Sequence, residues 1–366
     1  MAEPACAYGR VRRSLTGRTR RCRDKRCMHD AALSFNPFAF WLQTLQAGSS
    51  FFSGQSSGDA DVGTSVPALT HRRDGHCLYV PDAALPGRAP MVVMLHGAGQ
   101  DAEDFAACTA MNAAAERHGF VVLYPAQSSR VSANRCWTWW EPAHQQRASG
   151  EPARLVALTQ QVAAEFNVDS SRIYVAGLSA GGAMAALLGE LFPDVYAAVG
   201  VHSGLAPRAG TDLSSALAAM RGTNGAPAAP SGMPTIVFHG ERDTTVHPVN
   251  GHRVVAAAVG SDCEVTAQQR FQCNGRSVTR VTLRGGPGAR QFAAEHWQLH
   301  DADHAWSGGD RAGSYADPAG PEASEEMLRF FDAQRLGCQA VAALRTLPAS
   351  RHVTTPPHLL SSAKSA

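Results

Sequence analysis

The hydrophobic positions of this chain fall into short runs that are separated by longer, partly polar stretches. Six runs of four to six residues are rich in β-branched and aromatic side chains, which is typical of buried strands. They are Cys77–Val80, Met91–Leu95, Phe120–Tyr124, Arg172–Ala176, Ala197–His202 and Thr235–His239. Because most positions in these runs are apolar rather than alternating, we expect strands that are covered on both faces.

Two of the intervening segments have the spacing of apolar residues that is typical of amphipathic helices. They are Asp104–His118 and Ala153–Glu165, and they are expected to be crossover helices between strands. Strands that alternate with helices in this way form mainly parallel sheets. The sequence therefore predicts an α/β fold, with a mainly parallel central sheet and helices on both faces.

Composition divides the 366 residues into four parts. Residues 1–27 form an Arg-rich leader that is expected to be disordered, and residues 28–63 carry a Phe/Trp-rich segment and a Gly/Ser-rich linker. Residues 64–342 hold the α/β domain, and residues 343–366 form a Ser/Thr/Pro/Ala-rich tail that is expected to have little order. Met28 is a hypothetical true start of the protein.

The formal net charge of +2 hides an uneven distribution of charge. Residues 1–30 carry nine Lys and Arg against three Asp and Glu, whereas the rest carries 24 against 28. The basic leader is short and poor in aromatic residues, so no nucleic-acid site is predicted. No run approaches the roughly 18 apolar residues of a membrane helix, and no standard secretory signal is predicted.

The cysteines leave the redox compartment open. There are nine, so at least one has no partner within the chain. Cys263 and Cys273 flank a polar, strand-like segment, and they either form a disulfide that closes this loop or remain free. Cys22 and Cys27 have no downstream His or Cys at the spacing of a zinc site.

The segment with the clearest chemistry is Gly177-Leu178-Ser179-Ala180-Gly181, which lies between a strand-like run and a small-residue, helix-like run, Gly182–Leu191. This is the G-x-S-x-G pattern in the strand-turn-helix context of a nucleophile elbow. The sharp turn leaves no space for side chains beside the serine, and the helix that follows presents its positive N-terminal end. Ser179 is therefore the predicted nucleophile.

A serine nucleophile requires a general base and an acid that orients it, and in this fold they follow the serine in the order acid, histidine. Asp243 lies in the loop after the run Thr235–His239 and is the preferred acid, with Glu241 as the alternative. His304 lies in a loop with paired glycines and is the preferred base. The other histidines after Asp243 are His247, His252, His296 and His300.

The oxyanion of an acyl-transfer reaction needs backbone N–H donors. His96-Gly97-Ala98-Gly99-Gln100 follows the run Met91–Leu95, where a donor loop is expected, so Ala98 and Ala180 are the predicted donors. The loop has no Gly-Lys-Ser/Thr continuation and no dinucleotide fingerprint. No cofactor is implied, and the chemistry needs no metal.

The tryptophans are candidates for substrate contacts. Trp137, Trp139 and Trp140 occupy three of four consecutive positions, and we expect at least one to be exposed near the site. They either belong to the core or form a substrate wall. Trp306, two residues after His304, is predicted to contact substrate, together with Trp137, Trp139 and His202.

Taken together, these motifs resemble the poly(3-hydroxybutyrate) depolymerase family of esterases over about residues 75–335. The resemblance rests on the motifs quoted above together with Cys136-Trp137, the segment Asp194–Gly204 and His304-Ala305-Trp306. It implies an α/β-hydrolase catalytic domain in which Ser179, Asp243 and His304 occupy the triad positions. It also implies cleavage of polyester or oligomer esters, and it extends to feruloyl and acetyl esterases.

Two departures from the family pattern refine this expectation. Many secreted members have Cys at the position of Ala98 and carry a separate substrate-binding domain, and neither is visible here. The chain looks more like the intracellular depolymerases, so a cytoplasmic enzyme is expected, with secretion left open. The segment Phe35–Leu45 would then bind the surface of storage granules or pack on the hydrolase body.

Two alternatives to a polyester depolymerase remain. The first is a feruloyl or acetylxylan-type carboxylesterase with the same triad. The second is a non-catalytic protein that coats granules, which the intact triad argues against.

Overall fold

The structure is a computed structural model that describes residues 67–81, 88–223, 230–285 and 293–337. The predicted leader, the Phe/Trp-rich segment with its linker and the tail therefore lie outside the described residues. All described residues belong to one unit of the chain, Ala60–Ala366.

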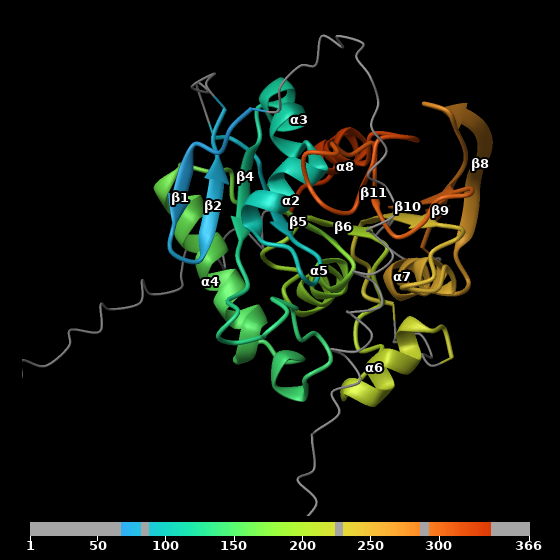
Figure 1. Ribbon diagram of the computed structural model, residues 1–366, viewed down its shortest axis with the longest axis horizontal. Helices are drawn as coiled ribbons and strands as arrows, with labels where there is room; N and C mark the ends of the chain where they lie inside the picture. Colours follow the sequence, from blue (N-terminus) through green and yellow to red (C-terminus); the bar gives the residue numbers. More distant parts are fainter. Residues whose placement is uncertain (1–66, 82–87, 224–229, 286–292, 338–366) are drawn as a thin grey trace, which may run out of the picture. The chain divides into compact units, whose positions relative to one another are not determined.

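A single twisted sheet organises this unit (Figure 1). Its ten strands among the described residues follow the order β1-β2-β4-β3-β5-β6-β7-β10-β9-β8. The strands are β1 His71–Arg73, β2 His76–Tyr79, β3 Met91–Leu95, β4 Val121–Pro125, β5 Ile173–Leu178, β6 Ala198–His202, β7 Thr235–Gly240, β8 Glu264–Cys273, β9 Arg276–Arg284 and β10 Ala293–Leu299. A separate two-stranded parallel pair joins β11, Trp306–Ser307, to β12, Ala316–Asp317.

The six central strands, β4 to β10 in sheet order, run parallel to one another, and each edge is antiparallel. At one edge β1 and β2 are antiparallel to their neighbours, and at the other edge β8, β9 and β10 form an antiparallel ribbon. The predicted mainly parallel sheet is confirmed for the centre, where parallel strands must be covered on both faces.

Helices cover both faces of the sheet. They are α2 Ala102–Thr109, α3 Met111–His118, α4 Gly150–Glu165, α5 Ala180–Leu191, α6 Leu213–Met220, α7 Val249–Val259 and α8 Ala323–Asp332, with a short 3₁₀ turn, η2, at Pro142–His144. Two consecutive residues of β6 show the two layers, because successive residues in a strand face opposite sides. Val199 contacts α5 at Gly189, whereas Gly200 lies against Met327 and Phe331 of α8.

The predicted single helix over Asp104–His118 is wrong, because it is two helices. The backbone of Ala110 adopts a left-handed conformation, with φ of 48°, and separates α2 from α3. The end of α2 is capped from far along the chain, since the Asp310 N–H donates to the carbonyl oxygen of Cys108 at 2.9 Å. This long-range contact has no signature in the local hydrophobic spacing.

The core and the ribbon differ in burial. All residues of β3, β5, β6 and β7 are buried, whereas β8 is largely exposed. Within the described ranges, no helix has the length and apolar character needed to cross a membrane. Cys263 and Cys273, at the two ends of β8, are both free thiols, so of the two alternatives the structure has the unpaired one.

Candidate active site

The nucleophile elbow joins the end of β5 to the start of α5. Ser179 lies at this junction with φ of 56° and ψ of −117°, a backbone conformation that L-residues rarely adopt and that is typical of strained functional turns. Its N–H donates to the carbonyl oxygen of His202 at 2.9 Å, and its own carbonyl accepts from the Ala183 N–H at 2.9 Å. The residue is partly exposed, so the turn holds the serine at the surface of a rigid frame.

The two flanking glycines are required by close backbone contacts. A Cβ on Gly181 would lie 2.0 Å from the carbonyl oxygen of Leu95, and a Cβ on Gly177 would lie 2.4 Å from the carbonyl carbon of Gly181. Neither contact can be relieved by moving a flexible side chain, because the atoms met are backbone. The same contacts show that the elbow packs directly against the end of β3, where the predicted donor loop begins.

The predicted acid and base meet beyond the same edge of the sheet. His304 Nδ1 lies 2.7 Å from Asp243 Oδ2, and the two side chains are 11% and 0% exposed. Asp243 follows β7, and the loop of His304 lies against the end of that strand, since a Cβ on Gly240 would meet the carbonyl oxygens of Ala302 and Asp303 at 2.4 and 2.6 Å. The alternative acid, Glu241, pairs instead with His300, at 3.2 Å.

The Asp243 carboxylate is held by donors on both oxygens. Oδ1 accepts from the N–H groups of Thr245 and Val246 at 2.9 and 2.7 Å, while Oδ2 faces His304. Burial works against ionisation of this carboxyl, but the charge of His304 and the hydrogen bonds from His304 and His239 outweigh it, so the pKa of Asp243 is lowered. An ionised, buried carboxylate is what orients a histidine through its Nδ1–H.

The strand ends bring the nucleophile and the acid–base pair to one edge of the sheet. Leu178 of β5 pairs with His202 of β6, and His202 pairs with Phe238 of β7. Ser179 and the loop of Asp243 therefore leave two parallel strands, β5 and β7, in the same direction, with β6 between them. In open α/β sheets this carboxyl edge is where ligands bind. The assignment of Ser179, Asp243 and His304 to catalysis stays a prediction that this arrangement supports.

Three hydrogen bonds hold the loop His96–Gln100, which carries the predicted oxyanion donor Ala98. The Gly97 N–H donates to Gln100 Oε1 at 3.0 Å, the Gly99 N–H donates to the carbonyl of Asn134 at 2.8 Å, and Gln100 Nε2 donates to the Ser314 carbonyl at 3.0 Å. Within the described residues, the N–H of Ala98 donates no hydrogen bond.

The second predicted donor, Ala180, is the first residue of α5, where N–H groups have no acceptor in their own helix. The amides of Ala98 and Ala180 are therefore available as donors.

Gln100 was not singled out from the sequence, and its only signal was a polar residue directly after the glycine-rich loop.

Two buried histidines support this edge in their neutral form. Burial lowers the pKa of His96 to about 4 and that of His202 to about 3. His96 Nε2 accepts from the Gln127 N–H at 3.1 Å, and His202 Nε2 accepts from the Ser307 N–H at 3.0 Å. His202 thereby ties β6 to β11, the strand that starts two residues after His304.

The aromatic residues that were considered for substrate contact are all buried. Trp137, Trp139 and Trp140 are 2%, 3% and 7% exposed, so the expectation that at least one is exposed is wrong. Trp306 and His202 are both 0% exposed and stack on each other with ring centroids 5.0 Å apart.

Two of these rings donate hydrogen bonds within the described residues. Trp137 Nε1 donates to the carbonyl oxygen of His96 at 3.1 Å, so this tryptophan braces the donor loop. Trp306 Nε1 donates to Ser324 Oγ at 3.3 Å, and its ring packs edge-on against Phe105. Local sequence places an aromatic residue near a site, but it does not say whether the ring faces substrate or the core.

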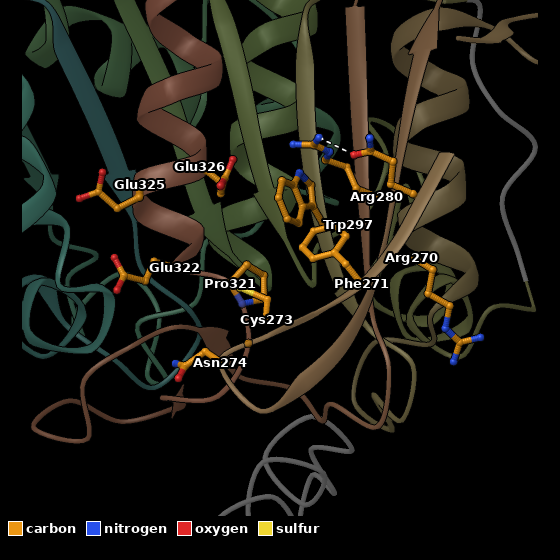
Figure 2. Close-up of a pocket in the computed structure, with 12 residues that line it drawn as sticks. Arg270, Phe271, Cys273, Asn274, Arg280, Trp297, Pro321, Glu322, Glu325 and Glu326 are labelled. Atoms are coloured by element: carbon orange, nitrogen blue, oxygen red, sulfur yellow. Dashed lines mark hydrogen bonds between the residues drawn. The ribbon is translucent and has the colours of Figure 1, made fainter. Parts of the chain in front are cut away.

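A separate groove of about 900 Å³ lies between the ribbon and α8 (Figure 2). Phe271 and Trp297 lie in its centre, Arg270 extends from the ribbon, and Glu322 and Glu325 come from the α8 side. None of the predicted site residues lines this groove. Among the described residues, no cluster of three or more His, Cys, Asp or Glu is arranged to hold a metal ion.

Comparison with known sequences identifies the family. The sequence pattern of the esterase PHB depolymerase family matches residues 75–270, which is more than half of the chain. The chain belongs to the esterase PHB depolymerase family. Its match includes the elbow and the Asp243 loop, whereas His304 lies beyond the matched range.

The relatives of this chain are named for different substrates. Poly(3-hydroxyalkanoate) depolymerase C of Paucimonas lemoignei is 34% identical over 191 residues, which is 48% of this chain and 46% of that protein. Feruloyl esterase B of Neurospora crassa is 33% identical over 129 residues, 35% of this chain and 43% of that protein. The chain thus spans less than half the length of these two relatives.

The fold has a solved counterpart. An acetyl xylan esterase from Aspergillus awamori superposes with a TM-score of 0.55 at 16% identity, and the match covers 70% of this chain and 93% of that one. At this identity the similarity shows the fold alone. The expected α/β-hydrolase fold and the resemblance to a family of carboxylic ester hydrolases are both confirmed.

Proposed function

We propose that the protein is a serine esterase that hydrolyses poly(3-hydroxybutyrate) or its oligomers through an acyl-enzyme on Ser179. The observation that carries the proposal is the 2.7 Å hydrogen bond between His304 and the buried Asp243 at the sheet edge that also carries the elbow. An inert granule-coating protein would have no need of a strained serine, a buried ionised carboxylate and a partly buried histidine beside it.

The mechanism assigns one task to each group. Asp243 accepts the hydrogen bond of His304 Nδ1–H, which leaves Nε2 free to take the Ser179 proton as the hydroxyl oxygen attacks the ester carbonyl. The N–H groups of Ala98 and Ala180 stabilise the oxyanion, and the protonated histidine then donates its proton to the leaving alcohol. Water, deprotonated by His304, finally attacks the acyl group and releases the acid from Ser179.

The polyester substrate is supported by the family and by the Paucimonas relative, which matches over 191 residues and is named a poly(3-hydroxyalkanoate) depolymerase. A feruloyl or acetylxylan ester is the second candidate, because the Neurospora relative is a feruloyl esterase at 33% identity. Both candidates use the same triad and differ only in the acyl and alcohol groups that the site accepts.

The expected cytoplasmic location and binding to storage granules stay predictions. The binding to granules depends on the segment Phe35–Leu45, which lies outside the described residues.

The experiment compares wild type with Ser179→Ala on amorphous poly(3-hydroxybutyrate), on its soluble oligomers and on a feruloyl ester. We expect 3-hydroxybutyrate or its oligomers from the first two substrates with wild type, and a rate at least about 10³-fold lower with Ser179→Ala. Release of ferulate without 3-hydroxybutyrate would establish the second candidate. Equal rates for wild type and Ser179→Ala would refute the catalytic assignment.

A further inference from the structure

A second histidine, His239, contacts the same carboxylate oxygen of Asp243, Oδ2, as the proposed base. His239 Nε2 lies 3.4 Å from Asp243 Oδ2, and the two side chains are 2% and 0% exposed. Asp243 therefore faces two imidazole rings, of which the proposed mechanism uses only His304. Since buried polar groups are rarely placed without partners, the second ring calls for a physical account.

The hydrogen bond of His239 fixes its tautomer. Nε2 lies 2.7 Å from the carbonyl oxygen of Val246, and because a carbonyl oxygen only accepts, Nε2 must carry the hydrogen. The N–H of the same Val246 donates to Asp243 Oδ1 at 2.7 Å. His239 thus holds the carbonyl group of Val246 by one hydrogen bond, and the N–H group of Val246 holds the Asp243 carboxylate by another.

The position of His239 in the fold makes this contact rigid. It is the penultimate residue of β7, a strand whose residues are all buried, and Asp243 follows it by four residues after the tight turn that starts at Gly240. The ring therefore projects from the sheet into the loop 243–246, which has no regular secondary structure of its own. A loop held by an anchor on a strand keeps its carboxylate in one orientation.

The ring of His239 also lines a small pocket. A Cβ on Gly251 would lie 3.2 Å from His239 Nδ1 and 2.8 Å from His296 Nε2, and neither nitrogen has a hydrogen-bond partner within the described residues. The pocket has a volume of about 150 Å³.

Several titratable groups surround His239. The groups around it are Asp243 and His304 on the loop side, and Glu241, His252, His296 and His300 on the pocket side. Glu241 is already paired with His300 at 3.2 Å. Among these contacts, the hydrogen bond of His239 to the acid loop is the one from Nε2–H to the carbonyl oxygen of Val246, at 2.7 Å.

We propose that His239 is a positioning residue that holds the loop Asp243–Val246 so that the Asp243 carboxylate is aimed at His304 Nδ1. The proposal rests on the proposed function, because the base that Asp243 orients is His304. His239 touches no substrate in this scheme, and its effect passes through the loop.

Two substitutions separate positioning from simple packing. His239→Phe keeps a ring in the core but removes the N–H, whereas His239→Gln keeps an N–H donor at nearly the same reach as Nε2. On a soluble p-nitrophenyl ester we expect His239→Phe to lower kcat by about tenfold to a hundredfold with KM changed by less than about twofold. His239→Gln should stay within about threefold of wild type in both constants.

The pH profile adds a readout that loss of packing alone would not move. If the Asp243–His304 hydrogen bond is weakened in His239→Phe, protonated His304 is less stabilised, and the acid limb of kcat/KM shifts to lower pH. The downfield proton resonance of this hydrogen bond, which His304→Gln should abolish, is expected to weaken in His239→Phe and to persist in His239→Gln. The resonance does not depend on turnover.

The outcomes distinguish the two proposals. A wild-type kcat and acid limb in His239→Phe, or equal losses in the Phe and Gln variants with an unmoved acid limb, would overturn the positioning role. Equal activity of Ser179→Ala and wild type would instead refute the proposed function, and the proton resonance would still decide whether His239 orients Asp243.

Discussion

The centre of the sheet and the ribbon at its edge are built on opposite principles. Strands β3, β5, β6 and β7 are buried along their full length and pair in parallel, whereas β8 is exposed at most positions and pairs on one side only, with β9. Every group in the proposed mechanism lies in a loop or helix start beyond a central strand. None lies on β8 or β9.

This difference in burial shows which part of the fold can hold a strained backbone and a buried charge. The positive φ of Ser179 and the buried charge of Asp243 both raise the free energy of the folded state. Such features persist only where densely packed surroundings hold the residue in place. Strand β8 has charges as well, but those of Glu264 and Arg270 are exposed to solvent. Equivalent substitutions in the two regions should therefore have very different effects.

The largest expected difference comes from a pair of glycines. Gly181→Ala should destabilise the protein by more than about 4 kcal/mol and abolish activity, because its Cβ would lie 2.0 Å from the Leu95 carbonyl oxygen. Gly275→Ala in the β8–β9 turn should cost only about 1 kcal/mol, since its Cβ would meet nothing within 4 Å and only its φ of 77° is unfavourable.

Urea denaturation of both variants measures this contrast. A Gly181→Ala protein as stable as Gly275→Ala would contradict the close packing of the elbow against β3.

The next difference concerns two acidic residues. Asp243→Asn should lower kcat by about 10⁴-fold, because the amide no longer holds His304 in the required tautomer. Glu264→Gln on the exposed β8 should change kcat by less than about twofold. Steady-state kinetics on a soluble ester compare the two, and a small effect of Asp243→Asn would reassign the acid.

A smaller effect is expected on the pH dependence of stability. The pKa of Asp243 is lowered in the folded protein. The ionised carboxylate therefore stabilises the folded state above the unfolded pKa of 3.8, and this stabilisation is lost as the pH falls from 3.8 toward the folded pKa. At pH 7 wild type should exceed Asp243→Asn by about 2 kcal/mol in the free energy of unfolding. Denaturation between pH 7 and pH 3 should show this gap narrowing, and a gap that widens toward low pH would contradict the lowered pKa.

The sequence predicted the central strands well, because their signal is local. Met91–Leu95 was predicted with the bounds that the structure has, and β4, β5, β6 and β7 differ from the predicted runs by one or two residues at their ends. The sixth central strand, β10, was not among the predicted runs. A run of buried β-branched residues needs no knowledge of its neighbours to be recognised. The ribbon was not predicted as part of the sheet, because β8 is polar and exposed and its pairing with β9 is antiparallel.

The candidate site shows the same limit. Ser179, Asp243 and His304 were singled out because glycine spacing and chain order carry their signal. The orientation of Trp306 and Trp137 was not predictable, since both rings are placed by partners far along the chain, Ser324 and His96. The role of His239 was equally hidden, because its partner is a backbone carbonyl.

The central claim is that Ser179 is the nucleophile of an acyl-enzyme, and covalent labelling tests it most directly. Wild type should be treated with an organophosphonate ester and digested, and the peptides should be analysed by mass spectrometry. The account predicts one added phosphonyl group, located on Ser179, with concurrent loss of esterase activity and greatly slowed labelling in Asp243→Asn. Labelling at another residue, or inactivation that leaves Ser179 unmodified, would contradict it.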